Sequence, residues 1–281
     1  MISIRHDGKV LNAQLDARAI NPLSRLFQRE LAGLVARLES RRGELVAAVI
    51  GFGTDGGDSR HEHAHLLALT PAQISDCMQM LSAYNALLRR LEAPGMPVIA
   101  NLGGAVSGHA LGLALACHCR IALDDVHLSL PQVQRGLAPV AGEVARTVRL
   151  AGLRGAAPIL LEGATLDAAQ ARQAGLLHHV AASRTELARL TYAARAQRQA
   201  IQPWDARNSS LPGGGPRSAA MRDWLQLAPA RAGLEQPAVA ATLCAMVEGA
   251  QVGFDCALLL ESRYFCHTVM NSARNNYAFS F

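Results

Sequence analysis

Residues 97–118 constrain the fold of this chain more than any other segment. They read PVIANLGGAVSGHALGLALACH. The apolar run at the start is typical of a strand that is buried on both faces, and the later apolar stretch is typical of a buried helix. Between them lies a turn with three glycines, the residue that tolerates backbone angles closed to other residues. The segment therefore predicts a strand, a glycine turn and a helix in direct succession.

Strands and helices are expected to alternate along the rest of the chain. Apolar and polar residues alternate over Ser3–Leu15 around Asp7-Gly8, which predicts a hairpin. Buried strands are expected over 44–50, 96–101, 121–123 and 126–130, and helices over 26–38, 71–91, 137–150, 156–162 and 168–174. This order is that of an α/β fold in which helices cover a sheet. Beyond Pro237 the pattern is helical to Phe281.

Four motifs in sequence order resemble the enoyl-CoA hydratase/isomerase (crotonase) family. They are the glycine segment 97–118, the hairpin start DGKV at 7–10 with the helix entry AINPLS at 19–24, the LLEG at 160–163, and LDAAQARQAGLLHHV at 166–180. Each motif alone is a weak signal, whereas four in the right order are a strong one. The resemblance implies an α/β fold with a crotonase-like ββα superhelical core and a helical C-terminal region.

The C-terminal part narrows the resemblance to one branch of that family. QPWD at 202–205, PGG at 212–214 and ESRYF at 261–265 resemble the segment that joins the hydratase domain to a dehydrogenase domain in multifunctional fatty-acid β-oxidation proteins. We expect an acyl-CoA-binding core over 1–198, a Pro/Gly-rich linker over 199–236 and a helical region over 237–281. The resemblance also implies a homo-trimer or hexamer. It leaves open whether a separate hydroxyacyl-CoA dehydrogenase is a partner.

The two catalytic positions of the family are occupied by unusual residues. In active hydratases one catalytic Glu lies in the first turn of the helix that follows the glycine turn, and a second Glu follows a proline. Here these positions are Gly112 and, after Pro131, Gln132. Glycine has no side chain and an amide does not titrate near neutrality. Because each general acid or base contributes about 10²- to 10⁴-fold, standard hydratase activity is predicted to be lost or strongly reduced.

Two glycine-containing loops are expected to bind the thioester carbonyl of an acyl-CoA. In the family, backbone N–H groups from these loops form an oxyanion hole. The matching residues are Asp55 and Gly56 in the first loop, and Gly108 and His109 in the second. His109 stands where the family usually has glycine, so it must tolerate the backbone angles of the turn. Coenzyme A would enter as part of the substrate, and neither a separate cofactor nor a metal is expected.

Other titratable residues could replace the missing carboxylates and give the fold an altered chemistry. Glu143 lies near the start of the next predicted helix, where it is either a proton-transfer group or a charge that favours the helix N-terminus. His109 could titrate in the right range or could only fill space. The loop His61–His65 reads HEHAH, which matches the zinc pattern H-E-x-x-H without a third ligand at the known spacings. A non-catalytic interaction partner of β-oxidation enzymes is the alternative from another class.

Charge and composition bound the remaining functions. The net charge is +5, and Lys9 is the only lysine, so the positive charge is nearly all arginine. Clusters such as Arg41-Arg42 and Arg89-Arg90 indicate either a solvated surface or a basic mouth for a phosphorylated ligand. No DNA-binding motif is present, so nucleic acid is not an expected partner. The apolar runs are too short to cross a membrane and no signal peptide is recognised, which favours a cytoplasmic protein.

The six cysteines do not show the spacing of a metal site or of a redox pair. Cys117-His118-Cys119 is the densest group, and no second cluster completes a set of four ligands. We therefore expect reduced and mostly buried thiols.

Overall fold

The protein, seen here as a computed structural model, is described over residues 2–52, 71–196, 200–219, 221–224, 226 and 235–278. The chain divides into two units, each described by itself. The first consists of Met1–Gly57, Tyr84–Ser129 and Thr165–Ser209, and the second of Asp58–Ala83, Leu130–Ala164 and Ser210–Phe281. The divisions expected at residues 198 and 236 stay predictions.

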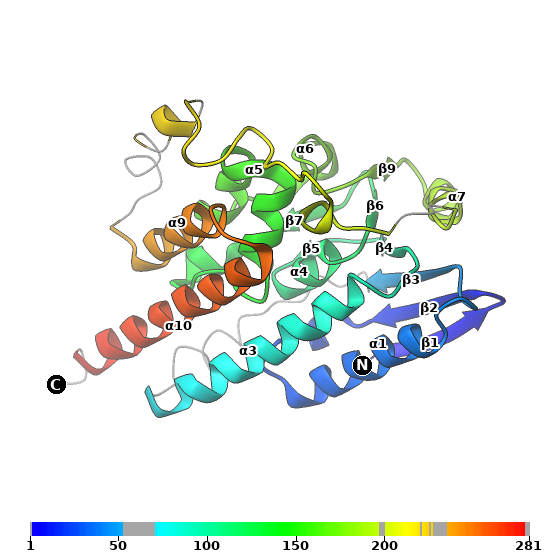
Figure 1. The fold of residues 1–281 in the computed structure, drawn as a ribbon, viewed down its shortest axis with the longest axis horizontal. Helices are drawn as coiled ribbons and strands as arrows, with labels where there is room; N and C mark the ends of the chain where they lie inside the picture. Colours follow the sequence, from blue (N-terminus) through cyan, green and yellow to red (C-terminus); the bar gives the residue numbers. More distant parts are fainter. Residues whose placement is uncertain are drawn as a thin grey trace. The chain divides into compact units, whose positions relative to one another are not determined.

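A six-stranded sheet forms the centre of the first unit. Its order is β1 (Ile2–Asp7), β2 (Val10–Leu15), β3 (Ala47–Phe52), β4 (Val98–Leu102), β6 (Cys119–Leu123) and β9 (His179–Ala181), as Figure 1 shows. The predicted hairpin is confirmed, because β1 and β2 pair antiparallel around Gly8, which has a φ of 56°. All other neighbouring strands are parallel. β6 is buried throughout, as expected for a central parallel strand.

The helices of the first unit are the 3₁₀ helix η1 (Ala17–Ala19), α1 (Arg25–Ser40), α4 (His109–Leu115), α6 (Ala168–Gln173), α7 (Arg184–Ala194) and the 3₁₀ helix η3 (Pro203–Asp205). The sequence predicts three of them, α1, α4 and α6, and does not predict the other three, α7, η1 and η3. The helix α3 (Pro71–Leu91) has residues in both units. α1 begins where the sequence indicates, because the Ser24 hydroxyl accepts a hydrogen bond from the backbone N–H of Phe27.

A second, smaller sheet supports the glycine turn. It consists of β5 (Val106–Ser107), β7 (His127–Ser129) and β8 (Leu166–Asp167), in that order. β5 and β7 are parallel, and the Ser129 hydroxyl donates a hydrogen bond of 2.9 Å to the Ser107 hydroxyl. This sheet fixes the backbone just before α4 begins.

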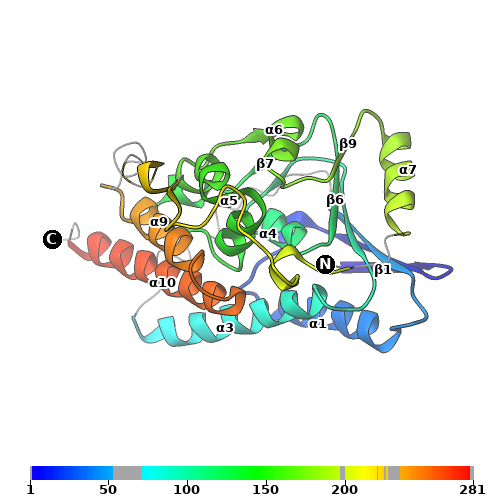
Figure 2. The ribbon, with the colours of Figure 1, turned by 45° about the horizontal axis from the view of Figure 1, so that its top comes forward.

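The second unit is helical wherever it is described with regular structure. It contains the 3₁₀ helix η2 (Pro131–Arg135), α5 (Glu143–Leu161), α9 (Pro237–Gly249) and α10 (Phe254–Ala278). Figure 2 shows α9 and α10 side by side, and α9 also packs against α5. In the part of the chain that the structure covers, no helix combines the length and the apolar character needed to cross a membrane.

The helix predicted over 137–150 begins later than expected. Gly136, Ala141 and Gly142 all have left-handed φ values, of 78°, 66° and 85°, so the chain is not helical before Glu143. The sequence predicts two helices with a break between residues 150 and 156, and the structure has its break at Gly152. α5 continues to Leu161 but contains the non-helical residue Gly152, with φ 71° and ψ 171°.

Candidate functional site

The glycine turn places the backbone strain on Gly108 rather than on His109. Gly108 has φ 57° and ψ −131° and donates its N–H to the carbonyl of Ser129 at 2.9 Å. α4 begins at His109, and the non-glycine residues with positive φ among those described are Ala141 and Asn208. His109 therefore has an ordinary helical backbone. The unusual backbone angles of the turn are adopted by Gly108, so His109 does not need to adopt them.

Gly112 lies inside α4 and is buried. Every residue of this helix from Ala110 to Leu115 is buried, and the helix contains no acidic residue. The Gly112 N–H donates to the carbonyl of Gly108 at 3.0 Å, so Gly112 is in regular helix. Gly112, which the sequence predicts to be the first catalytic position, thus has no proton-transfer group, and α4 has no carboxylate in its place.

Gln132, which the sequence predicts to be the second catalytic position, is hydrogen-bonded to Glu143. Gln132 in η2 is 3% exposed, and Glu143 at the start of α5 is fully buried. The Gln132 Nε2 donates to Glu143 Oε2 at 2.7 Å, and the backbone N–H of Val140 donates to the same oxygen at 3.1 Å. The structure therefore brings together the two predicted residues Gln132 and Glu143. A carboxylate thus lies within hydrogen-bond distance of the Gln132 side chain.

Gln132 carries one buried polar atom that is not hydrogen-bonded. Its Oε1 has no partner among the described residues, although its Nε2 is well bonded. A buried amide oxygen without a donor is costly unless a water molecule or a ligand supplies one.

Glu261 is a buried carboxyl group whose role the sequence did not reveal. It reaches from α10 to the start of α5 and accepts hydrogen bonds from the N–H groups of Gly142 at 2.7 Å and Ala145 at 2.9 Å. The residue before α5 is Gly142, which cannot cap the helix with a side chain, so Glu261 satisfies the unpaired N–H groups. No Ser, Thr or Asp stands at the start of α5 to cap it. This absence was the one local signal that a distant residue acts as the cap.

The pKa of Glu261 is raised to about 8. Burial is the main cause because it disfavours the charged form, and the negative charge of Glu143 adds to the shift. The N–H bonds from Ala145 and Gly142 and the positive charge of Arg146 act in the opposite direction. Glu261 is therefore largely protonated near neutrality, in contrast to a carboxyl group in water.

This raised pKa makes the stability of the protein depend on pH. Between the unfolded value of 4.5 and the folded value of about 8, the folded state binds the extra proton, so stability falls as pH rises. We expect the free energy of unfolding to fall by about 2 kcal/mol from pH 6 to pH 7.5 relative to the Glu261→Gln variant, which has no titrating group there. Urea unfolding of both proteins at several pH values measures this difference. Parallel pH profiles of the two proteins would contradict it.

Several predicted site residues lie outside the described residues. These are Asp55 and Gly56 of the first oxyanion loop and the histidine loop His61–His65. Where side chains are described, no group of three His, Cys, Asp or Glu residues comes together as a metal site. In Cys117-His118-Cys119, Nδ1 of His118 accepts from the backbone N–H of Val98, and Nε2 contacts the carbonyl of Glu92. All six cysteines are free.

The arginine clusters that the sequence singled out do not form a basic mouth. Arg89 pairs with Glu92 and Asp205, and Arg90 pairs with Glu39. Arg41 pairs with Glu44, and Arg42 donates to the carbonyls of Pro94 and Ala93. Their charges are balanced by carboxylates or bound to backbone, so these clusters fit the interpretation as a solvated surface.

The sequence matches one protein family and a longer bacterial protein. The profile of the enoyl-CoA hydratase/isomerase family matches residues 9–206. The fatty acid oxidation complex subunit alpha of Idiomarina loihiensis is 30% identical over 188 residues, which are 64% of this chain and 25% of that protein. The chain thus matches about a quarter of the length of this curated relative.

Solved structures show the same fold at low sequence identity. An enoyl-CoA hydratase from Bacillus anthracis has a TM-score of 0.59 and 21% identity, over 96% of this chain and 91% of that chain. An enoyl-CoA hydratase/isomerase family protein from Silicibacter pomeroyi has a TM-score of 0.59 and 23% identity, over 86% and 96% of the two chains. At these identities the similarity shows the fold alone.

Proposed function

The chain belongs to the enoyl-CoA hydratase/isomerase family and has its α/β crotonase fold with a helical C-terminal region, and from this premise we propose that it binds acyl-CoA thioesters in fatty-acid β-oxidation with standard hydratase activity lost or strongly reduced. One observation carries the proposal. At the family's two catalytic positions, Gly112 has no side chain in a helix without acidic residues, and Gln132 is an amide that donates to Glu143. Neither residue can give or take a proton near neutrality.

The thioester carbonyl would be held by backbone N–H groups at the glycine turn. His109 is the first residue of α4, and Gly108 before it leaves the backbone uncovered by a side chain. The proposed donors are the N–H of His109 and that of Asp55, both at positions that match the family's oxyanion loops. A developing oxyanion could still be stabilised there, although no carboxylate is available at positions 112 and 132 to complete the hydration.

The oligomeric state, the partner and the cellular location are also part of the proposal. The family commonly assembles as trimers, and we extend a homo-trimer or hexamer to this chain. We also propose a separate hydroxyacyl-CoA dehydrogenase as a partner, because QPWD at 202–205 and ESRYF at 261–265 resemble the segment that joins a hydratase domain to such a dehydrogenase. A cytoplasmic location is consistent with this homo-oligomer and with this partner.

Calorimetric titration tests the ligand class and the donor together. We expect saturable binding of at least one acyl-CoA in a series of chain lengths. His109→Pro should weaken this binding about tenfold, because proline removes one N–H donor at the first helical position, where it is well tolerated. His109→Ala, the matched control, retains the N–H and should bind like the unmodified protein. No binding of any acyl-CoA would contradict the proposal and favour a non-catalytic interaction partner.

A second candidate function rests on the contact between Glu143 and Gln132. The Glu143 carboxylate is 2.7 Å from the side chain at the family's second catalytic position, so it could carry out proton transfer there. Such a protein would be a crotonase-fold enzyme with a relocated acid/base group.

Glu143→Gln separates the two candidates because it removes the charge and retains the volume. On the first proposal, residual hydration of crotonyl-CoA should change by less than about twofold, since Glu143 takes no part in it. A loss of about a hundredfold or more would instead identify Glu143 as the acid/base group. Thermal unfolding of the variant shows whether it remains folded during the assay.

A further inference from the structure

One face of the six-stranded sheet is polar beside α7. Along β2 the side chains of Leu11, Ala13 and Leu15 are buried, whereas Asn12 is half-buried and Gln14 is exposed. The parallel register places Gln14 beside Gly51 of β3 and Gly51 beside Asn101 of β4. α7 packs against β4, β6 and β9. α7 thus covers the sheet at β4, β6 and β9, and the polar residues of β1 and β2 lie on the part of the sheet that it does not cover.

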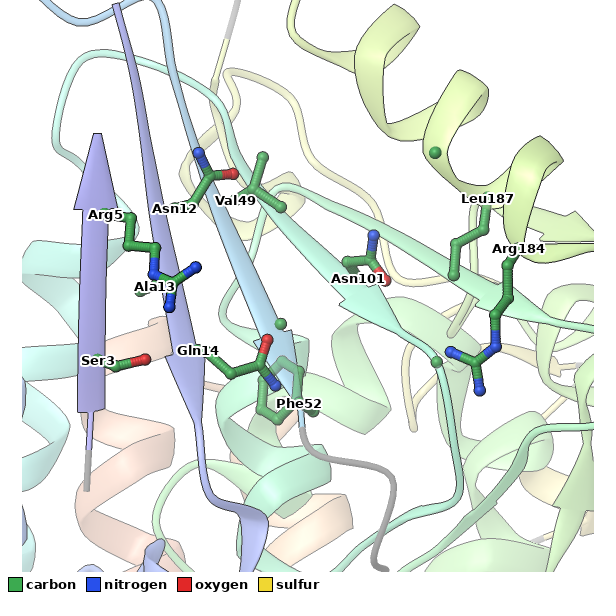
Figure 3. Close-up of a pocket in the computed structure, with 13 residues that line it drawn as sticks. Ser3, Arg5, Asn12, Ala13, Gln14, Val49, Phe52, Asn101, Arg184 and Leu187 are labelled. Atoms are coloured by element: carbon green, nitrogen blue, oxygen red, sulfur yellow. The ribbon is translucent and has the colours of Figure 1, made fainter. Parts of the chain in front are cut away.

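This face forms a cavity of about 720 Å³, which we call the sheet-face pocket (Figure 3). The volume lies in the range of small-molecule binding sites, roughly 300–1,000 Å³. Its polar lining comes from Ser3, Arg5, Asn12, Gln14, Asn101 and Arg184, and Phe52 is among its apolar residues. All of these residues belong to the first unit.

Two arginines give the sheet-face pocket an unbalanced positive charge. Arg5 on β1 and Arg184 at the start of α7 lie on opposite sides of the pocket (Figure 3). The described lining contains no Asp or Glu, and neither arginine forms an ion pair within the described part of the chain. Arg41, Arg89 and Arg90, by contrast, all pair with carboxylates. The charge of Arg5 and Arg184 is thus available to a ligand.

Two glycines make room for the polar groups. A Cβ at Gly51 would lie 2.2 Å from Gln14 Oε1, so the Gln14 amide lies directly over the bare backbone of β3. A Cβ at Gly103 would lie 3.7 Å from Arg184 Nη1, so the guanidinium group reaches over the end of β4. Larger residues at these positions would occupy space that the pocket lining now uses.

We propose that the sheet-face pocket binds a small organic phosphomonoester, separately from the acyl-CoA thioester. Two guanidinium groups without carboxylate partners match a group that carries a charge of about −1.5 to −2 at neutral pH. A single guanidinium group can bind two phosphate oxygens at once, and the amides of Asn12 and Gln14 add donors. The apolar side chains of Val49, Phe52 and Leu187 line the same pocket and would contact the organic part.

Titration with phenyl phosphate tests the proposal. We expect saturable binding by calorimetry, and at least tenfold weaker binding by the Arg5→Ala, Arg184→Ala double variant. The matched control, Arg29→Ala with Arg172→Ala, removes the same charge from exposed positions outside the pocket and should change binding by less than twofold. Absence of saturable binding, or equal weakening in both double variants, would overturn the proposal.

Crotonyl-CoA separates this pocket from the coenzyme's own phosphates. We expect the Arg5→Ala, Arg184→Ala variant to bind crotonyl-CoA as the unmodified protein does, and crotonyl-CoA not to displace phenyl phosphate. A matching loss of crotonyl-CoA affinity, or displacement, would show that the pocket holds the nucleotide part of coenzyme A, and would overturn a separate site. Because phenyl phosphate is titrated alone, its binding can succeed or fail independently of thioester binding.

Discussion

The Gly112→Glu, Gln132→Glu double variant is expected to hydrate crotonyl-CoA at least about a hundredfold faster than the unmodified protein. Each restored carboxylate supplies a general acid/base group, and such a group contributes about 10²- to 10⁴-fold. Gly112 lies in regular helix, where glutamate is a better helix former than glycine. Glutamate has nearly the same volume as the buried Gln132, and because it would contact the Glu143 carboxyl group, the two carboxyl groups would share one proton. The loss of enoyl thioester absorbance measures the rate.

The matched control for this variant is Gly112→Gln, which fills position 112 without a carboxylate. It should leave the hydration rate of the Gln132→Glu protein unchanged, whereas glutamate at position 112 should raise it. A double variant that folds and binds crotonyl-CoA, yet hydrates it at the unmodified rate, would contradict the assignment of these two positions.

Gly152→Ala is expected to lower the free energy of unfolding by about 3 kcal/mol or more. Gly152 has φ 71° and ψ 171°, a region of backbone angles essentially restricted to glycine, with a cost of about 1–3 kcal/mol for other residues. A Cβ there would also lie 2.1 Å from the backbone carbonyl oxygen of Pro212. Since that contact is with backbone, it cannot be relieved by a side-chain rotation. Urea unfolding at a fixed pH measures the change.

Gly33→Ala is the control, because the same substitution should have the opposite sign there. Gly33 lies in the interior of α1, and a Cβ would meet no atom within 4 Å. Alanine should stabilise this helix by about 0.5–1 kcal/mol. A neutral or stabilising Gly152→Ala would mean that the contact between α5 and Pro212 is not formed in solution.

Elements with a strong local pattern could be predicted from the sequence. The helix α3 begins at Pro71 and ends at Leu91, as its amphipathic spacing predicts. The hairpin of β1 and β2 turns at Gly8, the residue that can adopt the left-handed angle. In both cases the signal lies within the segment itself, so no distant residue is needed to predict the structure.

The start of α5 could not be predicted in the same way. Residues 137–141 are apolar and were expected to be helical, but Leu137, Ala138, Val140 and Ala141 are all buried in a non-helical stretch. Apolar residues buried on every side show no clear period, so spacing does not distinguish helix from irregular backbone. The cap of α5 is Glu261, which is more than a hundred residues away in the sequence.

The features of the candidate site also differ in whether they depend on local sequence or on distant residues. The assignment of Gly112, Gln132 and His109 to the site stays a prediction; Gly112 and His109 lie in the glycine segment 97–118, and Gln132 follows Pro131. The hydrogen bond between Gln132 and Glu143 depends on the irregular backbone between η2 and α5. Arg5 and Arg184 line the same pocket because of the strand order of the sheet, although 179 positions separate them in the sequence. The arginine clusters Arg41-Arg42 and Arg89-Arg90 are instead bound to carboxylates or backbone carbonyls.

This crotonase-fold protein is expected to bind an enoyl-CoA without hydrating it at an enzymatic rate. The most direct test measures both properties of the unmodified protein with crotonyl-CoA under one set of conditions. Calorimetry gives the affinity, and enoyl absorbance at saturating crotonyl-CoA gives the turnover. We predict saturable binding and a turnover at least a hundredfold below the typical enzymatic value of about ten per second. Turnover at about ten per second would contradict the account, since Gly112 and Gln132 could not be the acid/base positions of an active site that works at that rate.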